Sequence, residues 1–272
     1  MSAICFADIG YPLFTALPDG RKLCDDCVGT VVLDSETAKL LYLEALQFIR
    51  HSLGLRCPPA LNEVPVLAVD LHGMGEHRSS AAKNHHQNVR TQTLGLTLST
   101  LTQVRHYGQM PSQVRQLGHS FLLPQMLVAD VSVRRSVTAV LVLTGMPRRQ
   151  MAGVLAHEAF HVWCSFNPRM PPQLPPKVEE GLCQLVKMRY LTDQLQSRYG
   201  HTALPVMMND DGGGGDTNNW DYLLLRFLQH DIEINEDPVY GEGFRMAATS
   251  CNALGLDILL DHIAETSAFP AL

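Results

Sequence analysis

Two histidines four positions apart, with a glutamate directly after the first, form the clearest chemical motif in this 272-residue sequence. They are His157, Glu158 and His161, in the stretch HEAFH. Residues four apart lie on one face of a helix, so both imidazoles can reach a single metal ion. Glu158 is then placed to accept a proton from a water that the ion activates. The motif therefore predicts a hydrolytic Zn²⁺ site with two histidine ligands.

A catalytic zinc ion usually takes three protein ligands and leaves one position open for water. Glu179 and Glu180 open the next expected helix, after a proline-rich turn that can fold it back onto the motif. We expect Glu180 to be the third ligand, with Glu179 as the alternative. The two acids can also divide the roles, one on the metal and one holding a ligand histidine. Acids are favoured in a first helical turn by the helix dipole alone, so a solvated role stays open.

A second group of metal-ligating residues lies near the N-terminus. A CxxC pair follows an Asp-Gly hairpin signal at residues 19–20, which is the usual shape of a zinc knuckle. An upstream cysteine and aspartate share the same spacing, so a structural Zn²⁺ site with four ligands is one interpretation. An incomplete half-site with free thiols is the other. The candidate ligands are Cys5, Asp8, Cys24 and Cys27.

The segment PVYGEGFR near the C-terminus supplies a further candidate. Tyr240 can donate a hydrogen bond to an oxyanion, and Arg245 can pair with an acid near the metal. We expect Gly241 and Gly243 to form a tight turn. A turn with a buried phenol explains the segment equally well.

The elements that must position these residues follow from hydrophobic periodicity. The motif lies on an expected helix over 149–165, directly after a β-branched strand over 137–143, and the acidic pair begins a helix over 178–195. The polar stretch 71–88 is expected to be a loop with solvated histidines, and 209–219 a surface insertion. The fold class expected is α+β, mainly helical with a small β-sheet. Further helices are expected from Ser35 (with Ser35 as its cap) and over 222–229, 241–254 and 257–265, and a strand over 64–69.

Composition narrows the class of protein further. Hydrophobic residues make up 46% and charged residues 18% of the chain, which excludes a disordered protein. The net charge of −6 disfavours nucleic acid and membrane surfaces as partners. Seven cysteines without an export signal are typical of reduced thiols in an intracellular compartment, either cytoplasmic or nuclear.

Several segments resemble the peptidase domain of the plant LIM-domain, ubiquitin-activated peptidases that limit organ growth. The similarity follows the order of that family over nearly the whole chain. The matching stretches are DGRKLCDDC, GLTLS, TAVLVLTGMPR, HEAFH, VEEGLCQLV, PVYGEGFR and HIAETSAFP.

The resemblance implies a gluzincin-like metallopeptidase domain over residues 35–272, preceded by a LIM-like zinc-knuckle remnant over 1–34. It implies that the two histidines of HEAFH are zinc ligands, that Glu158 is the general base, and that the acidic pair supplies the third ligand. Members of that family are latent endopeptidases that mono-ubiquitination activates. Ubiquitin and regulatory protein substrates are therefore the implied partners.

The sequence departs from that family's pattern in its first part. It contains neither the upstream ubiquitin-interacting motifs nor a complete LIM domain, and Asp8 stands where the pattern has a cysteine. The catalytic positions show no departure. We therefore expect a zinc-dependent endopeptidase that holds an extended substrate along a sheet edge. The alternatives are a non-catalytic zinc-containing adaptor of the same fold, and a module whose only zinc is bound by the N-terminal cysteines.

Overall fold

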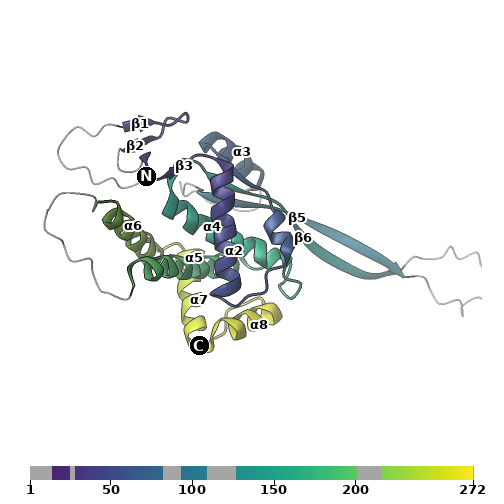
Figure 1. Cartoon of the computed structure of the whole chain (residues 1–272). Helices are drawn as coiled ribbons and strands as arrows, with labels where there is room; N and C mark the ends of the chain where they lie inside the picture. Colours follow the sequence, from purple (N-terminus) through teal and green to yellow (C-terminus); the bar gives the residue numbers. More distant parts are fainter. Residues whose placement is uncertain (1–13, 25–27, 82–92, 109–126, 201–215, 272) are drawn as a thin grey trace, which may run out of the picture.

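The computed structural model describes residues 14–24, 28–81, 93–108, 127–200 and 216–271. These residues form an α+β fold with seven α-helices and three small sheets (Figure 1). In chain order the elements are β1 (Phe14–Ala16), β2 (Lys22–Cys24), β3 (Val31–Val32), α2 (Ser35–His51), η1 (Pro59–Glu63), β4 (Val66–Val69), α3 (Leu71–Ala81), β5 (Gly95–Gly108), β6 (Leu127–Leu143), β7 (Met146–Pro147), α4 (Arg148–Phe166), α5 (Pro176–Tyr199), α6 (Asp216–Glu233), α7 (Gly241–Leu254) and α8 (Leu256–Thr266).

The largest described sheet has the strand order β4-β6-β5. β6 lies in the centre, with β4 parallel on one side and β5 antiparallel on the other. The end of β6, Val140 to Leu143, is at most 1% exposed, as a continuous apolar strand requires. Gly145 then turns the chain at a φ of +71°, which favours glycine, and β7 leads into α4. This short connection folds α4 back against the sheet.

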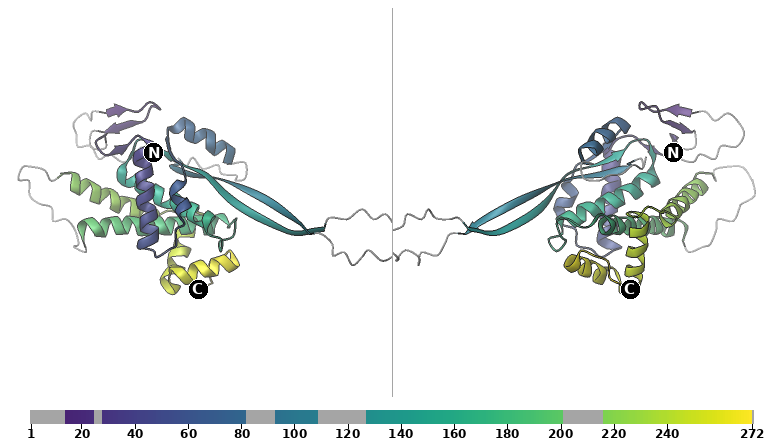
Figure 2. Two further views of the ribbon diagram at one scale, coloured as in Figure 1. Left: turned by 45° about the vertical axis from the view of Figure 1, so that its right-hand side comes forward. Right: turned by 180° about the vertical axis from the view of Figure 1, so that it is seen from behind.

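β5 and β6 continue together well beyond the sheet as a two-stranded ribbon, which we call the arm (residues 99–108 and 127–137). Figures 1 and 2 show the arm leaving the rest of the molecule. The sequence predicted a strand only over 137–143, so β6 is ten residues longer than expected. β5 was not predicted, although leucine at positions 94, 96 and 98 alternates with polar residues, which is the period of a strand.

Helix α4 occupies the centre of the helical part. It contacts α2, α5, α6 and the strands β5 and β6. Its residues from Met151 to Phe160 are all buried, so this part of α4 packs on every side. Helices α6 and α7 pack against α5, and α8 packs against α7.

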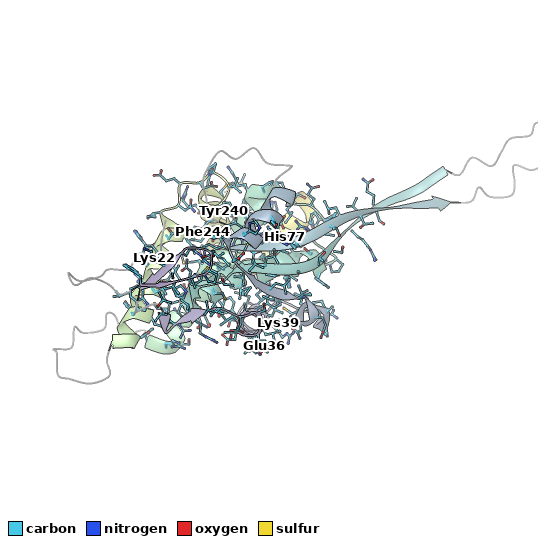
Figure 3. All side chains as sticks on the ribbon, turned by 90° about the horizontal axis from the view of Figure 1, so that it is seen from above. Lys22, Glu36, Lys39, His77, Tyr240 and Phe244 are labelled. Atoms are coloured by element: carbon cyan, nitrogen blue, oxygen red, sulfur yellow. The ribbon has the colours of Figure 1, made fainter. Side chains whose placement is uncertain are left out.

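Helix α2 confirms the helix expected from Ser35, but its cap differs. The side chain of Asp34 accepts from the backbone N–H of Thr37 at 2.7 Å, while the Ser35 hydroxyl accepts from Ala68 of β4. Lys39, labelled with Glu36 on α2 in Figure 3, donates to backbone carbonyls beside η1. These contacts fix α2 against the segment that precedes β4.

The expected loop over 71–88 is wrong in its first part, because Leu71–Ala81 is helix α3. The Asp70 carboxylate accepts from the backbone N–H of Gly73, and Met74 is buried. Two glycines and a nearly uniform polarity remove the periodic signal that would have revealed this helix. The expected insertion over 209–219 is wrong in its last part, since α6 begins at Asp216, and residues 209–215 lie outside the described residues. Of the remaining expected elements, the helix over 241–254 is present with the same ends, whereas the other helices and the strand over 64–69 are present with shifted ends.

The hairpin signal at residues 19–20 is confirmed, since β1 and β2 pair antiparallel on either side of it. Leu17 packs close to the Gly145 turn, so the hairpin lies on the body of the protein. No helix among the described residues is long and apolar enough to cross a membrane.

Candidate metal centre

The candidate centre is formed by two adjacent helices. The sequence folds them together because Asn167 ends α4 and a proline-containing turn reverses the chain before α5 begins at Pro176. Gly153 allows close approach, because a side-chain carbon there would contact Leu191 of α5 at 3.1 Å. The two histidines of HEAFH contact the acidic pair in the first turns of α5, as the sequence predicted.

Three ligand atoms from these helices lie close together. His157 Nε2 is 3.0 Å and His161 Nε2 is 3.5 Å from the same oxygen, Oε2 of Glu180. The two Nε2 atoms are 3.2 Å apart. Atoms bound tetrahedrally to one zinc ion at about 2.0–2.1 Å would lie roughly 3.3–3.4 Å from one another. The spacing therefore fits a small tetrahedral cation, and the sequence placed these three residues together correctly.

A thiol lies beside the same imidazoles. Cys183 Sγ and ring nitrogens of His157 and His161 fall within 4.8 Å of one another, so a His/His/Cys group is a second geometric candidate. Burial raises the pKa of Cys183 to about 12, which keeps the thiol protonated at neutral pH. A bound metal ion deprotonates a coordinating thiol, so this pKa does not decide between the two donors. Glu180 is the better third donor because its Oε2 lies 3.0 and 3.5 Å from the two Nε2 atoms.

The other acid of the pair takes a different place. Glu179 Oε1 accepts from His161 Nδ1 at 2.9 Å, on the opposite side of the ring from Nε2. Arg135 of β6 donates to both oxygens of Glu179, at 2.6 and 3.3 Å. A carboxylate on the far nitrogen orients a ligand imidazole and fixes which nitrogen is free for the metal. Sequence reasoning missed Arg135, which no local motif marks.

Burial and neighbouring groups shift the pKa values of three residues of the centre in opposite directions. Burial lowers the pKa of His161, but the Cys183 sulfur and the carboxylates of Glu180 and Glu179 outweigh burial and raise that pKa well above its usual value. Burial also raises the pKa of Glu180, yet the two imidazoles hold it below the ordinary range. Glu179 shows the same balance, with His161 and Arg135 lowering its pKa against burial. Such ionised carboxylates beside imidazoles are the donors that a divalent cation requires.

Glu158, the predicted general base, is 5% exposed and lies beside β5. Thr97 Oγ1 donates to Glu158 Oε2 at 2.7 Å. Thr97 was not predicted from sequence, although it belongs to the GLTLS stretch.

Of the two candidates in PVYGEGFR, Tyr240 lies beside the centre and Arg245 does not contact it. The ring of Tyr240 lies 6.4 Å from that of His157, nearly parallel to it, and Figure 3 shows Tyr240 beside Phe244 at the start of α7. Burial, and then the charge of Glu180, raise the pKa of Tyr240, so it stays a hydrogen-bond donor. Arg245 donates to the backbone carbonyl of Asn235 at 2.7 Å, so its expected pairing with an acid near the metal is wrong.

The two glycines of that segment have different roles. Gly241 lies where the turn before α7 enters the helix, and a side-chain carbon there would overlap the backbone of Asn235, as the expected tight turn requires. Gly243 lies in α7, and the backbones of Gly243 and Gly181 are so close that a side chain on either would overlap the other helix. This contact places the start of α7, and with it Tyr240, beside the centre.

Comparisons with known proteins identify the family of this chain. A family model described as "DA1-like: Protein DA1" matches residues 59–266, which include every element of the centre. The chain belongs to the DA1-like family. The similarity to plant LIM-domain proteins that the sequence suggested is thereby confirmed.

Curated relatives of this DA1-like chain come from plants. Protein DA1-related 1 of Arabidopsis thaliana is 30% identical over 266 residues, covering 94% of this chain and 46% of the relative. Protein DA1 of Arabidopsis thaliana is 29% identical over 263 residues, with 94% and 47% covered. LIM domain-containing protein HDR3 of Oryza sativa subsp. japonica is 28% identical over 268 residues, with 94% and 51% covered. The chain thus spans about half the length of these relatives. No solved structure matches it significantly.

A cavity of about 600 Å³ lies elsewhere in this DA1-like chain, at the C-terminal end of α4. Trp163 and Phe166 of α4 and Leu260 of α8 contribute apolar walls. No residue of the candidate centre lines it.

The N-terminal ligands stay a prediction. Cys5, Asp8 and Cys27 lie outside the described residues, and only the backbone of Cys24, at the end of β2, is described. Of the histidines expected to be solvated, His72 and His77 are exposed on α3, whereas His85 and His86 lie outside the described residues. The other cysteines that the structure describes are free thiols, as expected: Cys57, Cys164, Cys183 and Cys251.

Proposed function

We propose that this member of the DA1-like family is a zinc-dependent endopeptidase with a gluzincin-like arrangement of ligands. The observation that carries the proposal is the triangle of donor atoms from His157, His161 and Glu180, with edges of 3.0, 3.2 and 3.5 Å. Three donors from one side leave the fourth position of a tetrahedral ion for water, as in catalytic zinc sites. When bound, the zinc ion polarises the peptide carbonyl and acidifies water.

The remaining steps of the reaction are assigned to different side chains. Glu158 accepts a proton from the attacking water while the water oxygen forms its bond to the carbonyl carbon, and later returns the proton to the leaving amine. Tyr240 donates a hydrogen bond to the oxyanion that develops on the carbonyl oxygen. Glu179 and Arg135 hold His161 in the orientation that leaves Nε2 free.

Replacing the base tests this proposal. Glu158→Gln keeps the shape of the side chain but cannot accept the proton, so we expect zinc content to stay unchanged and cleavage to fall at least about 100-fold. Cleavage is measured as new peptide termini, by mass spectrometry of a proteome-derived peptide library. Glu36→Gln, on the exposed surface of α2, is the matched control and should cleave like the wild type.

The same comparison separates the enzyme from its main alternative, a non-catalytic zinc-containing adaptor. An adaptor would bind zinc, and neither the wild type nor Glu158→Gln would produce new termini. A regulatory role with protein substrates, and activation by ubiquitin, are extensions of the proposal that rest on the family. The proposed compartment is intracellular.

We further propose a second, structural zinc ion at Cys5, Asp8, Cys24 and Cys27. The double variant Cys24→Ser, Cys27→Ser should lower the zinc content from two ions per chain to one. A fall from one ion to none would instead favour the module whose only zinc lies at the N-terminus.

A further inference from the structure

We propose that strand β5 positions the general base, with the Thr97 hydroxyl as the positioning group and Gly95 as the opening that admits the Glu158 carboxylate. The inference rests on the proposed function. It adds a positioning residue that belongs neither to the HEAFH motif nor to the metal ligands. It concerns the strand at the free edge of the β4-β6-β5 sheet, which lies against α4.

The hydrogen bond is short and lies in a buried place. Thr97 Oγ1 is 2.7 Å from Glu158 Oε2 and 3.4 Å from the backbone carbonyl of Glu158, so its single hydrogen belongs to the carboxylate. Within the described part of the chain, no second side-chain donor lies within hydrogen-bond distance of that carboxylate. A nearly buried carboxylate is costly unless a donor compensates it, which gives the Thr97 hydroxyl a specific task.

Gly95 shows that the second carboxylate oxygen also faces β5. A side-chain carbon at Gly95 would lie 2.7 Å from Glu158 Oε1 and 2.6 Å from Val154 Cγ1, closer than real atoms approach. Alternate residues of a strand share one face, so Gly95 and Thr97 both face α4. The Glu158 carboxylate therefore lies between α4 and β5, with the Thr97 hydroxyl at one oxygen and the space left by Gly95 at the other.

The hydrogen bond from Thr97 determines which carboxylate oxygen of Glu158 acts as the base. With Oε2 held by Thr97, we assign proton transfer from the attacking water to Oε1, which lies beside the space that Gly95 leaves open. The O–H bond of the water breaks, its electron pair stays on the oxygen that bonds to the carbonyl carbon, and the proton moves to Oε1. The hydrogen bond restricts rotation of the carboxylate, so the base does not have to be ordered during each turnover.

The experiment compares Thr97→Val, which has the same shape without the hydroxyl, with Thr97→Ser, which restores it. The substrate is a peptide that the wild type cleaves in the library described above. We expect Thr97→Val to lower kcat about 10- to 100-fold with KM and zinc content unchanged, and Thr97→Ser to recover most of the rate. Thr100→Val is the matched control, because Thr100 lies on the same strand and its hydroxyl is bonded to exposed Ser136 instead. Equal rates for Thr97→Val and Thr100→Val would overturn the inference.

A second measurement does not depend on cleavage. Thr97→Val should lower the thermal midpoint in the wild-type background, where it leaves a buried carboxylate without its donor, and much less in Glu158→Leu, where no carboxylate remains. Equal shifts in both backgrounds would show that Thr97 acts through packing alone and would overturn the inference. If Glu158→Gln loses cleavage while Thr97→Val does not, only this inference fails. If Glu158→Gln cleaves like the wild type, the proposed function fails.

Discussion

Each ring of the candidate centre is constrained by groups on different elements. His161 faces Glu179 with Nδ1 and the donor triangle with Nε2, while His157 lies between Glu180 and the ring of Tyr240. Such contacts reduce the reorganisation needed when a cation binds or when charge develops on a substrate.

At the scale of single residues, Tyr240 provides a direct prediction. Tyr240→Phe removes the phenol hydroxyl and keeps the ring beside His157. We expect kcat to fall about 100- to 1000-fold, the range for loss of one oxyanion donor, while KM and zinc content stay unchanged. Steady-state kinetics on a cleaved peptide provide the measurement. A rise in KM with unchanged kcat would assign Tyr240 to substrate binding instead.

The sequence predicted the residues of the centre that neighbour one another on helices, and it missed those that come from strands. His157, Glu158 and His161 share one turn of helix, and the proline-rich turn made Glu180 a neighbour. Thr97 and Arg135 reach the same place only because β5 and β6 pack against α4. Such contacts depend on the tertiary arrangement of the sheet, which no spacing in the sequence encodes.

The same limit holds for whole elements. Helix α4 and helix α7 were predicted nearly to their ends, since apolar periodicity and breakers mark them. α3 was missed because its polarity is nearly uniform. The arm was missed because its strands alternate weakly, and the side chains described there, at 99–103 and 132–137, are exposed or half-buried. Close packing of α5 on α7 was also missed, because Gly181 and Gly243 can equally indicate a turn.

At the scale of elements, Arg135 connects the root of the arm through Glu179 to His161, a proposed metal ligand. Arg135→Met removes both hydrogen bonds to Glu179, which then holds His161 less firmly. We expect zinc affinity to fall about 10- to 100-fold, as for other losses of partners behind a ligand. Competition with a chromogenic chelator measures this affinity.

Arg134→Met is the matched control for that prediction. Arg134 is the next residue on the same strand, it is exposed, and it pairs with Thr102 of β5 across the ribbon. Its replacement should leave zinc affinity unchanged. Equal losses in the two variants would mean that the arm acts through its fold and not through the contact with Glu179.

At the scale of the whole molecule, the N-terminal hairpin is attached to the body partly by Asp19. Its carboxylate accepts from Arg21 at 2.9 Å and from the backbone N–H of Leu71, where α3 begins, at 3.2 Å. The hydrogen bond from Arg21 lowers the pKa of Asp19 despite partial burial. A lowered pKa means that this contribution to stability is complete above the unfolded-state pKa near 4 and is lost as the pH falls through the folded-state value.

We therefore expect hydrogen exchange in the hairpin to quicken as the pH is lowered from about 5 to 3, after correction for the intrinsic exchange rate. In Asp19→Asn the exchange should already be faster at pH 7 and should lose this acid dependence. An unchanged pH profile in Asp19→Asn would show that another group controls docking of the hairpin.

The central claim, that His157, His161 and Glu180 hold a zinc ion, is tested most directly by X-ray absorption at the zinc edge. The sample is the Cys24→Ser, Cys27→Ser variant, in which thiolates of the N-terminal CxxC pair are absent. We predict one zinc ion per chain with two imidazoles and otherwise oxygen ligands at about 2.0–2.2 Å. A sulfur scatterer at about 2.3 Å that disappears in Cys183→Ser, or a protein that retains no zinc, would contradict this account.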